Sequence, residues 1–272
     1  MTDTFAIGGD RVVGRLGFGA MRLTGPGIWG EPDDPDECRA VLRRAVELGV
    51  TLIDTADSYG PEVSERLIGE TLAPYPDGLV IATKAGFVRP QGRWQIDGRP
   101  EHLRAACEGS LRRLRLERIE LFQLHRIDRK VPAADQFGTL ADLHREGKIR
   151  HIGLSQVRVD DIRAARKVIE VVTVQNRYSV FDRTDDDVLA YCEAEGIGFM
   201  PWAPLGSGAH ASAAGALEHA ARELGATTAQ VAIAWLLRRS PVMLPIPGTS
   251  KMAHLEANMA AADLELPDAM VT

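Results

Sequence analysis

Four side chains with complementary acid–base chemistry occur at or near the ends of short apolar segments of this chain. Asp54 ends TLID, Lys84 ends LVIATK and His125 ends ELFQLH, while Tyr59 lies five residues after Asp54 in DTADSYG. Each segment is rich in Ile, Leu and Val and precedes a helical pattern, which is typical of a parallel strand followed by a loop. Because the carboxyl ends of parallel strands gather on one face, we expect a carboxylate, a phenol, an ammonium and an imidazole to meet there.

These four groups together are suited to delivering a proton. An aspartate stabilises an adjacent ammonium, and an ammonium favours the phenolate, so we expect the pKa of Tyr59 to fall from about 10 toward the working range. A tyrosine tuned in this way is a general acid for the alkoxide that develops during carbonyl reduction. His125 would hold the carbonyl oxygen in line. Each residue alone also has an ordinary structural interpretation, so the prediction of an enzyme depends on their conjunction.

Alternating strand and helix patterns along the chain would position these residues. The segment FAIGGDRVV indicates a β-hairpin near the amino end. Eight strand–helix units follow, with strands expected in RLGFGAM, TLID, LVIATK, IELFQLH, IRHIGLS, EVVTVQ, GFMPWAP and VMLPIP. Without a linker-like stretch between them, these units predict a single (β/α)₈ barrel domain over residues 1–272. A doubly wound sheet is the alternative, although GFGAMR lacks the third glycine of a Rossmann fingerprint.

Composition narrows the class of protein. The net charge of −6 argues against nucleic-acid or anionic-membrane binding, and we find neither a signal peptide nor a membrane-spanning run. The three cysteines (Cys38, Cys107 and Cys192) are far apart and lie in predicted helices, so we expect buried thiols in a reducing compartment, the cytoplasm. The seven histidines show no metal-ligand spacing, and we expect no metal site. No pattern predicts an oligomeric state.

In order and spacing, these motifs resemble the aldo-keto reductase family over nearly the whole chain. GFGAMRL resembles the first strand of the family, LGVTLIDTADSYG its Asp–Tyr segment, ATKAGF its Lys strand and LFQLHRID its His strand. The segments IRHIGLSQ, VQNRYS, MPWAPLG and IPGTSKMAHLEAN resemble its cofactor-binding segments. The resemblance implies a barrel that binds NADPH, with NADH as an alternative, and reversibly reduces small-molecule aldehydes or ketones. It assigns proton donation to Tyr59, tuning of that proton to Lys84 and Asp54, and substrate orientation to His125, while the nicotinamide supplies the hydride.

The resemblance also implies a set of cofactor-binding residues. Ser155, Gln156 and Gln175 would hydrogen-bond the nicotinamide carboxamide, and Trp202 would stack on the ring. The remaining contacts would come from Gly19 and Met21 beside the ring, Leu205 and Gly206 with SGAHASAAG over the pyrophosphate, Gly248, Thr249, Ser250, Lys251 and His254 at the 2′-phosphate, and Asn258 at the adenine. Asp54 and Ala203 are also expected to bind the cofactor. The stretch SGAHASAAG has a second interpretation, as a connector. A helix amino end at 248–251 would suit a phosphate.

Three residues depart from the commoner pattern of the family. Gln156 stands in place of Asn, Gly248 in place of Lys and His254 in place of Arg. The last two changes weaken the expectation of a strict NADPH preference and leave Lys251 as the cation. Since the chain ends soon after its last helix, we expect no carboxyl-terminal lid over the substrate and a broad substrate range. Substrate contacts would then come from loops, through Trp29, Phe87, Trp94 and Phe181.

Two other functions are compatible with the same barrel. A Schiff-base lyase would use Lys84 as a nucleophile, but pairing with Asp54 would keep the amine charged. A regulatory subunit would bind NADPH with little turnover while contacting a membrane channel. We expect an NADPH-dependent carbonyl reductase in preference to both.

Overall fold

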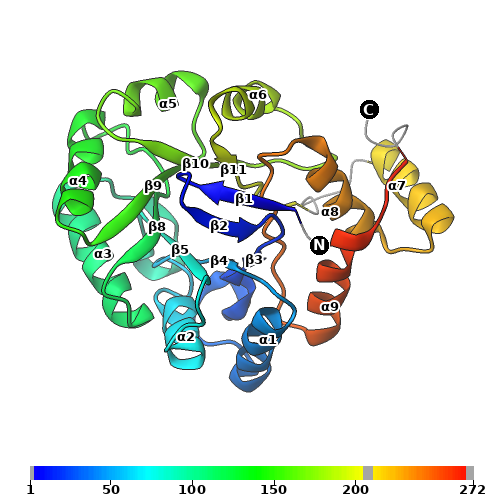
Figure 1. Ribbon diagram of the computed structural model, residues 1–272. Coiled ribbons are helices and arrows are strands. Elements are labelled where there is room, and N and C mark those ends of the chain that lie inside the picture. The colour runs from blue at the N-terminus through cyan, green and yellow to red at the C-terminus, as the bar shows by residue number, and fades with distance from the viewer. Residues whose placement is uncertain (1–2, 205–210, 268–272) are drawn as a thin grey trace.

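The computed structural model describes residues 3–204 and 211–267 of the 272-residue chain. Parallel strands curl into a ring within these residues (Figure 1). In order around the ring the strands are β3 (Phe18–Gly19), β4 (Leu52–Asp54), β5 (Val80–Ala85), β8 (Ile119–Leu124), β9 (Ile149–Ser155), β10 (Val171–Gln175) and β11 (Gly198–Phe199). Their positions confirm seven of the eight expected strands, although β3 and β11 are shorter than their apolar segments.

An extended segment over residues 242–247 closes the ring in place of a regular eighth strand. Phe199 exchanges backbone hydrogen bonds with Val242 and Leu244, over 2.8 and 2.7 Å, and Gly17 on the other side donates to the Pro245 carbonyl over 2.9 Å. The two prolines of this segment have no N–H, so it cannot form a complete ladder. This closure confirms the predicted (β/α)₈ barrel.

Helices form the outer layer of the barrel (Figure 1). They are α1 (Pro35–Glu47), α2 (Val63–Leu72), α3 (Pro100–Leu114), α4 (Ala133–Arg145), α5 (Val159–Ala165), α6 (Asp186–Glu195), α7 (Ala211–Leu224), α8 (Thr228–Arg239) and α9 (Met252–Ala260). A capping box of Thr227 and Gln230 opens α8, and α6 ends before Gly196, whose φ is +66°.

The helix α7 differs from the sequence-based expectation. It begins within SGAHASAAG, which had been interpreted as a pyrophosphate cover or a connector, and packs beside α8 (Figure 1). Leu205 and Gly206 lie outside the described residues. The alanine-rich composition of this stretch favours a helix, since Ala has the highest helix propensity.

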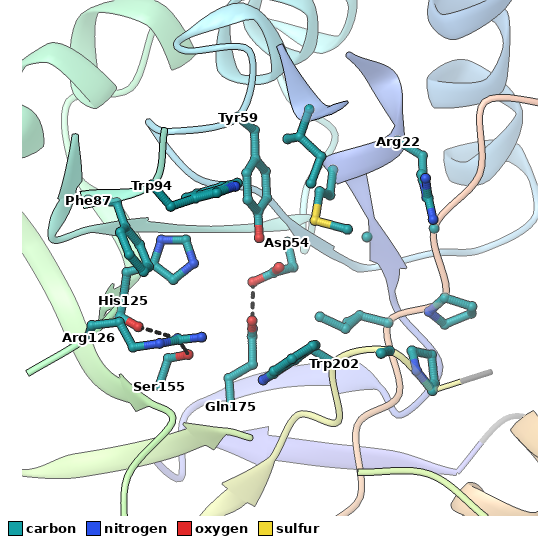
Figure 2. Close-up of a pocket in the computed structure, with 18 residues that line it drawn as sticks. Arg22, Asp54, Tyr59, Phe87, Trp94, His125, Arg126, Ser155, Gln175 and Trp202 are labelled. Atoms are coloured by element: carbon teal, nitrogen blue, oxygen red, sulfur yellow. Dashed lines mark hydrogen bonds between the residues drawn. The ribbon is translucent and has the colours of Figure 1, made fainter. Parts of the chain in front are cut away.

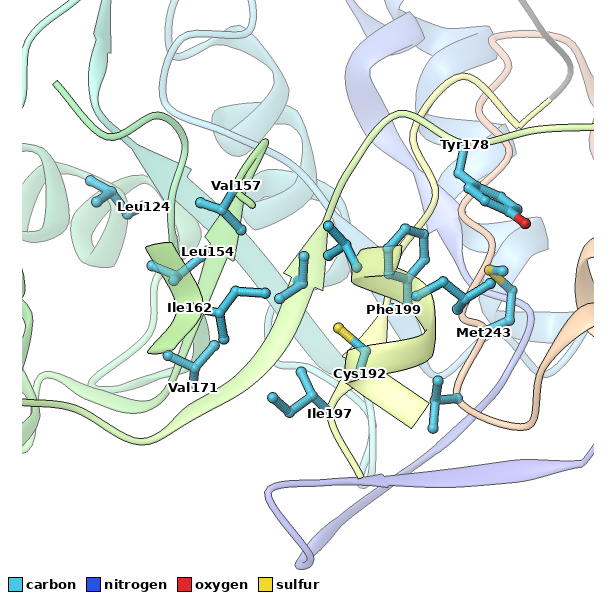
Figure 3. Packing of buried hydrophobic residues seen from close by; sticks show 14 of the residues in the cluster. Leu124, Leu154, Val157, Ile162, Val171, Tyr178, Cys192, Ile197, Phe199 and Met243 are labelled. Carbon is cyan, nitrogen blue, oxygen red and sulfur yellow. The ribbon is translucent and has the colours of Figure 1, made fainter. Parts of the chain in front are cut away.

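Apolar side chains fill the space between the sheet and the helices. Figure 3 shows one such region between β9–β11 and the helices α5 and α6. The residues packed there include Leu154, Ile162, Val171, Cys192, Ile197 and Phe199. All three cysteines are buried free thiols, as expected. No helix in the described ranges is long and apolar enough to cross a membrane.

The predicted amino-terminal hairpin covers one end of the barrel. Strands β1 (Thr4–Ile7) and β2 (Arg11–Gly14) pair antiparallel across the ring (Figure 1). Ile7 and Val13 are buried against side chains inside the barrel, and each contributes about 1.5–3 kcal/mol through removal from water. With this end closed, access to the barrel interior is from the carboxyl ends of the strands.

A second hairpin, which the sequence did not predict, follows β5 at that open end. Its strands are β6 (Phe87–Val88) and β7 (Gln95–Ile96), and Trp94 lies immediately before the second of them. Short 3₁₀ helices occur at η1 (Ala20–Leu23), η2 (Pro26–Ile28), η3 (Pro90–Gly92) and η4 (Ala261–Asp263). The β6–β7 hairpin supplies one wall of the site.

Candidate active site

The carboxyl ends of the strands surround a cavity of about 520 Å³ (Figure 2). Asp54 is the last residue of β4, His125 directly follows β8, and Tyr59 lies in the loop after β4. Lys84 lies in β5, where Ala82, two residues before it, pairs with Asp54. Since side chains alternate along a strand, this register turns Lys84 toward the barrel interior beside Asp54. The structure therefore brings together all four side chains on which the sequence argument depended.

Asp54 and Lys84 form a buried ion pair. The Lys84 Nζ lies 2.6 Å from Asp54 Oδ2 and 2.7 Å from the Thr55 carbonyl oxygen, and its side chain is 0% exposed. Burial alone would lower the pKa of Lys84, but Asp54 and Tyr59 together raise it above its ordinary value. Lys84 therefore stays protonated across the neutral range.

Two glutamine side chains complete the environment of Asp54. Gln123 and Gln175 each donate from Nε2 to Asp54 Oδ1, over 3.1 and 2.9 Å. Gln123 lies in β8 and was not predicted as a site residue. Hydrogen bonds to both oxygens offset the cost of burying the carboxylate. They also hold the carboxylate in position for Lys84.

Tyr59 is a buried phenol within reach of the Lys84 ammonium. Only 6% of Tyr59 is exposed, and its Oη accepts a hydrogen bond from Lys84 Nζ over 3.4 Å. The expectation of a lowered pKa was wrong: burial raises the pKa of Tyr59 above about 10, more than Lys84 lowers it. The phenol consequently remains protonated at neutral pH and can donate its proton.

His125 is a neutral imidazole in an aromatic environment. Its ring centroid lies 5.9 Å from that of Tyr59 and 4.7 Å from that of Phe87, with both rings edge-on. Burial, together with the charges of Lys84 and Arg126, holds the pKa of His125 well below 6.5. Its Nδ1 is 3.5 Å from Ser58 Oγ, a neighbour that sequence reasoning missed. A neutral His125 can donate one hydrogen bond to a carbonyl oxygen.

Several predicted cofactor residues line the same cavity. They are Gly19, Met21, Asp54, Ser155, Gln175, Trp202, Ala203 and Gly248. Gln156 does not line it: this exposed residue, with φ +53°, accepts a hydrogen bond from Trp202 Nε1 over 2.9 Å. It braces the indole of Trp202 in the position where a stacking ring had been predicted.

Two glycines form a narrow backbone contact at one side of the cavity. A Cβ atom at Gly248 would lie 2.4 Å from the Gly19 carbonyl oxygen, which is too close for any side chain. This contact gives a steric reason for the glycine where the family often has Lys. Gly19 and Gly248 line the cavity together with Trp202.

A second cavity of about 280 Å³ adjoins the first through Met21, Arg22 and Ile28. Ser250 and Lys251, for which the sequence resemblance implies phosphate contacts, line it immediately before α9. The Lys251 Nζ lies 2.5 Å from Glu37 Oε2, so its charge is already paired. Three other predicted residues that the structure describes line neither cavity: Thr249 accepts a hydrogen bond from the Lys251 N–H, His254 is exposed on α9 and Asn258 is buried.

The predicted substrate residues divide into two groups. Phe87 and Trp94 line the cavity, with ring centroids 5.2 Å apart. Trp29 and Phe181 do not line it. The guanidinium carbon of Arg89 lies 5.4 Å from the Trp29 ring and 3.8 Å from the Trp94 ring, so Trp29 packs behind the wall that Trp94 forms.

Two arginines in the cavity were missed by sequence reasoning. Arg126 directly follows His125, and Arg22 follows Met21 (Figure 2). Both belong to motifs that were used for the prediction, but only the preceding residues, His125 and Met21, were predicted as site residues. Among the described side chains, no three His, Cys, Asp or Glu residues are grouped in a way that could hold a metal ion.

Comparison with known proteins gives one consistent result. The chain matches the aldo/keto reductase family over residues 15–272. An uncharacterized oxidoreductase of Schizosaccharomyces pombe is 54% identical over 259 residues, which cover 95% of this chain and 84% of that protein. Pyridoxine 4-dehydrogenase of Escherichia coli is 41% identical over 278 residues, covering 100% and 96%. A solved structure, an aldo-keto reductase from Klebsiella pneumoniae in complex with NADPH, has a TM-score of 0.82 at 26% identity, covering 99% and 92%.

Proposed function

The chain belongs to the aldo/keto reductase family and is an oxidoreductase that uses NADP(H); we propose that it reduces small aldehydes or ketones with Tyr59 as proton donor. The observation that carries the proposal is the buried chain of contacts from Asp54 through Lys84 to Tyr59. His125 opens onto the same cavity. Such a chain has no evident structural purpose, since replacing a buried ion pair by apolar residues often costs no stability.

The two cavities support a binding mode for NADPH. Trp202 would hold the nicotinamide by stacking, and Ser155 and Gln175 would bind its carboxamide at the ends of β9 and β10. Lys251 and the amino end of α9 would contact the 2′-phosphate. When bound, NADPH supplies the hydride that reduces the carbonyl carbon.

Residues of this chain would then control the carbonyl oxygen. The neutral His125 donates a hydrogen bond that orients the oxygen toward Tyr59. As negative charge develops on that oxygen, Tyr59 donates its phenolic proton to give the alcohol, a contribution of about 10²–10⁴ in rate. The Lys84 ammonium, 3.4 Å from the phenolic oxygen, stabilises the phenolate that remains, and Asp54 keeps Lys84 charged.

A narrower proposal concerns the substrate. One relative is named for the oxidation of pyridoxine, whose reverse is reduction of the aromatic aldehyde pyridoxal. The edge-on pair of Phe87 and Trp94 provides apolar walls for a flat ring. We therefore include pyridoxal among the aldehydes that this enzyme reduces.

The Schiff-base alternative requires an uncharged lysine. Lys84 is held protonated by Asp54 at 2.6 Å and has no exposed surface from which to attack a carbonyl. Both features oppose its action as a nucleophile. We expect incubation with pyridoxal and borohydride to leave Lys84 unlabelled. Labelling at this residue would instead support a Schiff-base mechanism.

A screen of carbonyl compounds tests the proposed function directly. The purified chain is mixed with NADPH and with benzaldehyde, 4-nitrobenzaldehyde, an aliphatic aldehyde or pyridoxal, and NADPH absorbance is followed. We expect consumption of NADPH with at least one aldehyde, formation of the matching alcohol, and the reverse reaction with NADP and that alcohol. Absence of turnover with every aldehyde, in a protein that binds NADPH, would contradict the proposal and favour a binding role.

A further inference from the structure

Arg126 places a positive charge in the cavity that the proposed mechanism does not use. Its Nη1 donates to the His125 carbonyl oxygen over 2.6 Å and to Ser155 Oγ over 3.1 Å. The guanidinium carbon lies 5.4 Å from the ring centroid of Phe87. Figure 2 shows the side chain pointing into the cavity between His125 and Gln175. These contacts fix the guanidinium in place beside the groups that would hold the carbonyl.

No acidic side chain in the described ranges forms an ion pair with Arg126, whereas the nearby Arg129 bonds Asp161 over 3.0 Å. Asp54 is the one carboxylate among the described residues that line the cavity, and it is occupied by Lys84 and two glutamines. Arginine stays protonated in proteins, and a half-buried cation without a counter-ion costs free energy. The charge of Arg126 is therefore unbalanced until an anion enters the cavity.

The hydrogen-bonding edge of Arg126 is also only partly used. Both hydrogen bonds involve Nη1, which leaves Nε and Nη2 without a partner among the described residues. Both atoms are open to contact. Neither is among the buried side-chain nitrogens that lack a partner in the described residues, which include the Nε atoms of Arg15 and Arg239. Nε and Nη2 form the edge of a guanidinium that binds a carboxylate through two parallel hydrogen bonds.

We propose that Arg126 binds an anionic oxygen on the substrate, so that aldehydes carrying a carboxylate or another anionic oxygen on the same ring are preferred. This inference rests on the proposed carbonyl reduction. Ring and aldehyde would lie against Phe87 and Trp94, with the carbonyl at Tyr59 and the anion at Arg126. The ionised ring hydroxyl of pyridoxal, next to its aldehyde, belongs to this class.

The second cavity cation, Arg22, provides a matched control. It lines both cavities, together with Met21 and Ile28, and lies across the first cavity from Arg126 (Figure 2). Because the second cavity is the proposed site of the phosphate end of NADPH, an arginine there would contact the cofactor rather than the substrate ring. Substitution of Arg22 tests the effect of losing one positive charge from the cavity without altering the residue beside His125.

The test compares carboxylate substrates with neutral ones of the same shape. The 2-, 3- and 4-carboxybenzaldehydes and their methyl esters are assayed with wild type, Arg126→Met, Arg126→Lys and Arg22→Met. The readout is the ratio of kcat/KM for each acid to that for its ester, which cancels any general loss of activity. A charge-assisted hydrogen bond predicts a ratio of about 10–100 for at least one isomer in wild type. We expect a ratio near 1 in Arg126→Met, an intermediate ratio in Arg126→Lys and the wild-type ratio in Arg22→Met.

The outcomes separate this inference from the proposed function and from a cofactor role. A wild-type ratio near 1 for every isomer, or a ratio that survives in Arg126→Met, would overturn the inference while leaving carbonyl reduction intact. An NADPH dissociation constant more than about tenfold higher in Arg126→Met, with an unchanged ratio, would assign Arg126 to the cofactor carboxamide through its contact with Ser155.

Binding of benzoate keeps the inference testable even if no aldehyde is turned over. Calorimetry on the NADP-loaded protein should give a benzoate dissociation constant at least about tenfold lower for wild type than for Arg126→Met. Equal constants would overturn the anion site. Unfolding midpoints of all variants, together with Arg126→Gln as a second substitution, would separate a local effect from misfolding.

Discussion

The buried pair of Asp54 and Lys84 predicts an unusual dependence of stability on pH in one variant. Asp54→Asn preserves the shape of the side chain and removes its negative charge. Lys84, with 0% of its side chain exposed, would lose its counter-charge and keep only neutral partners, among them the Thr55 carbonyl and the Tyr59 hydroxyl. It must then either remain as an uncompensated buried charge or lose its proton.

The cost of this change can be bounded from both sides. Removing one partner of a buried ion pair costs about 3–5 kcal/mol. Deprotonation sets the upper limit, because lowering the pKa of a lysine from about 10.4 to 7 corresponds to about 4.6 kcal/mol at pH 7. We therefore expect Asp54→Asn to lower the free energy of unfolding by about 3–5 kcal/mol at pH 7. At about 2–4 °C per kcal/mol for a domain of this size, the midpoint of thermal unfolding should fall by roughly 6–20 °C.

The sign of the pH dependence distinguishes the two proteins. In wild type the raised pKa of Lys84 keeps it protonated in the folded and unfolded states, so it adds no slope at pH 7–9. In Asp54→Asn we expect the pKa of Lys84 in the folded state to be depressed, so that Lys84 carries a proton in the unfolded chain but not in the folded chain. Stability of the variant should therefore rise relative to wild type by up to about 1.4 kcal/mol per pH unit.

Urea unfolding followed by circular dichroism at pH 7, 8 and 9 measures the difference in free energy of unfolding between wild type and Asp54→Asn. Asp36→Asn serves as the control, because Asp36 pairs with Arg39 on the surface and should matter little. A loss below about 1 kcal/mol at pH 7 would show that the pair is not desolvated as the structure indicates. If the difference in free energy of unfolding between the two proteins does not shrink as the pH rises from 7 to 9, Lys84 does not lose its proton in the folded variant.

Three further predictions follow from the site. The kcat/KM for aldehyde reduction should be level from about pH 7 to 9, because the active phenol form of Tyr59 is lost only above its raised pKa and the neutral form of His125 only below its lowered pKa; a titration near pH 8 would contradict this. NADPH should quench tryptophan fluorescence through Trp202, and Trp202→Ala should abolish most of that quench; an unchanged quench would assign it to another tryptophan. Glu37→Gln should free Lys251 and raise the affinity for NADPH over that for NADH by about two- to fivefold, and an unchanged ratio of dissociation constants would remove Lys251 from the phosphate site.

The sequence was most informative where local chemistry determines structure. The capping box at Thr227, the glycine stop at Gly196 and the apolar strands of the barrel all depend on residues close together in the chain. Strand direction then placed Asp54 and Lys84 at one end of the barrel without knowledge of any contact. The closure through residues 242–247 was expected as a strand, and only its prolines made it irregular.

Features that depend on tertiary burial could not be predicted from the sequence. The pKa of Tyr59 was predicted in the wrong direction because Lys84 was visible in the chain while the burial of the phenol was not. Phe181 carries the same kind of side chain as Phe87, and only the fold separates the one that lines the cavity from the one that does not. Arg126 became a candidate only when its missing counter-ion could be seen.

Proton donation by Tyr59 is the central claim, and Tyr59→Phe tests it most directly. The substitution removes the hydroxyl that faces Lys84 and keeps the ring that packs against Trp94 and His125. On the best aldehyde found, turnover should fall by about 10²–10⁴, while the NADPH dissociation constant and the unfolding midpoint change little. Turnover close to that of wild type, in a variant that binds NADPH normally, would show that another group donates the proton.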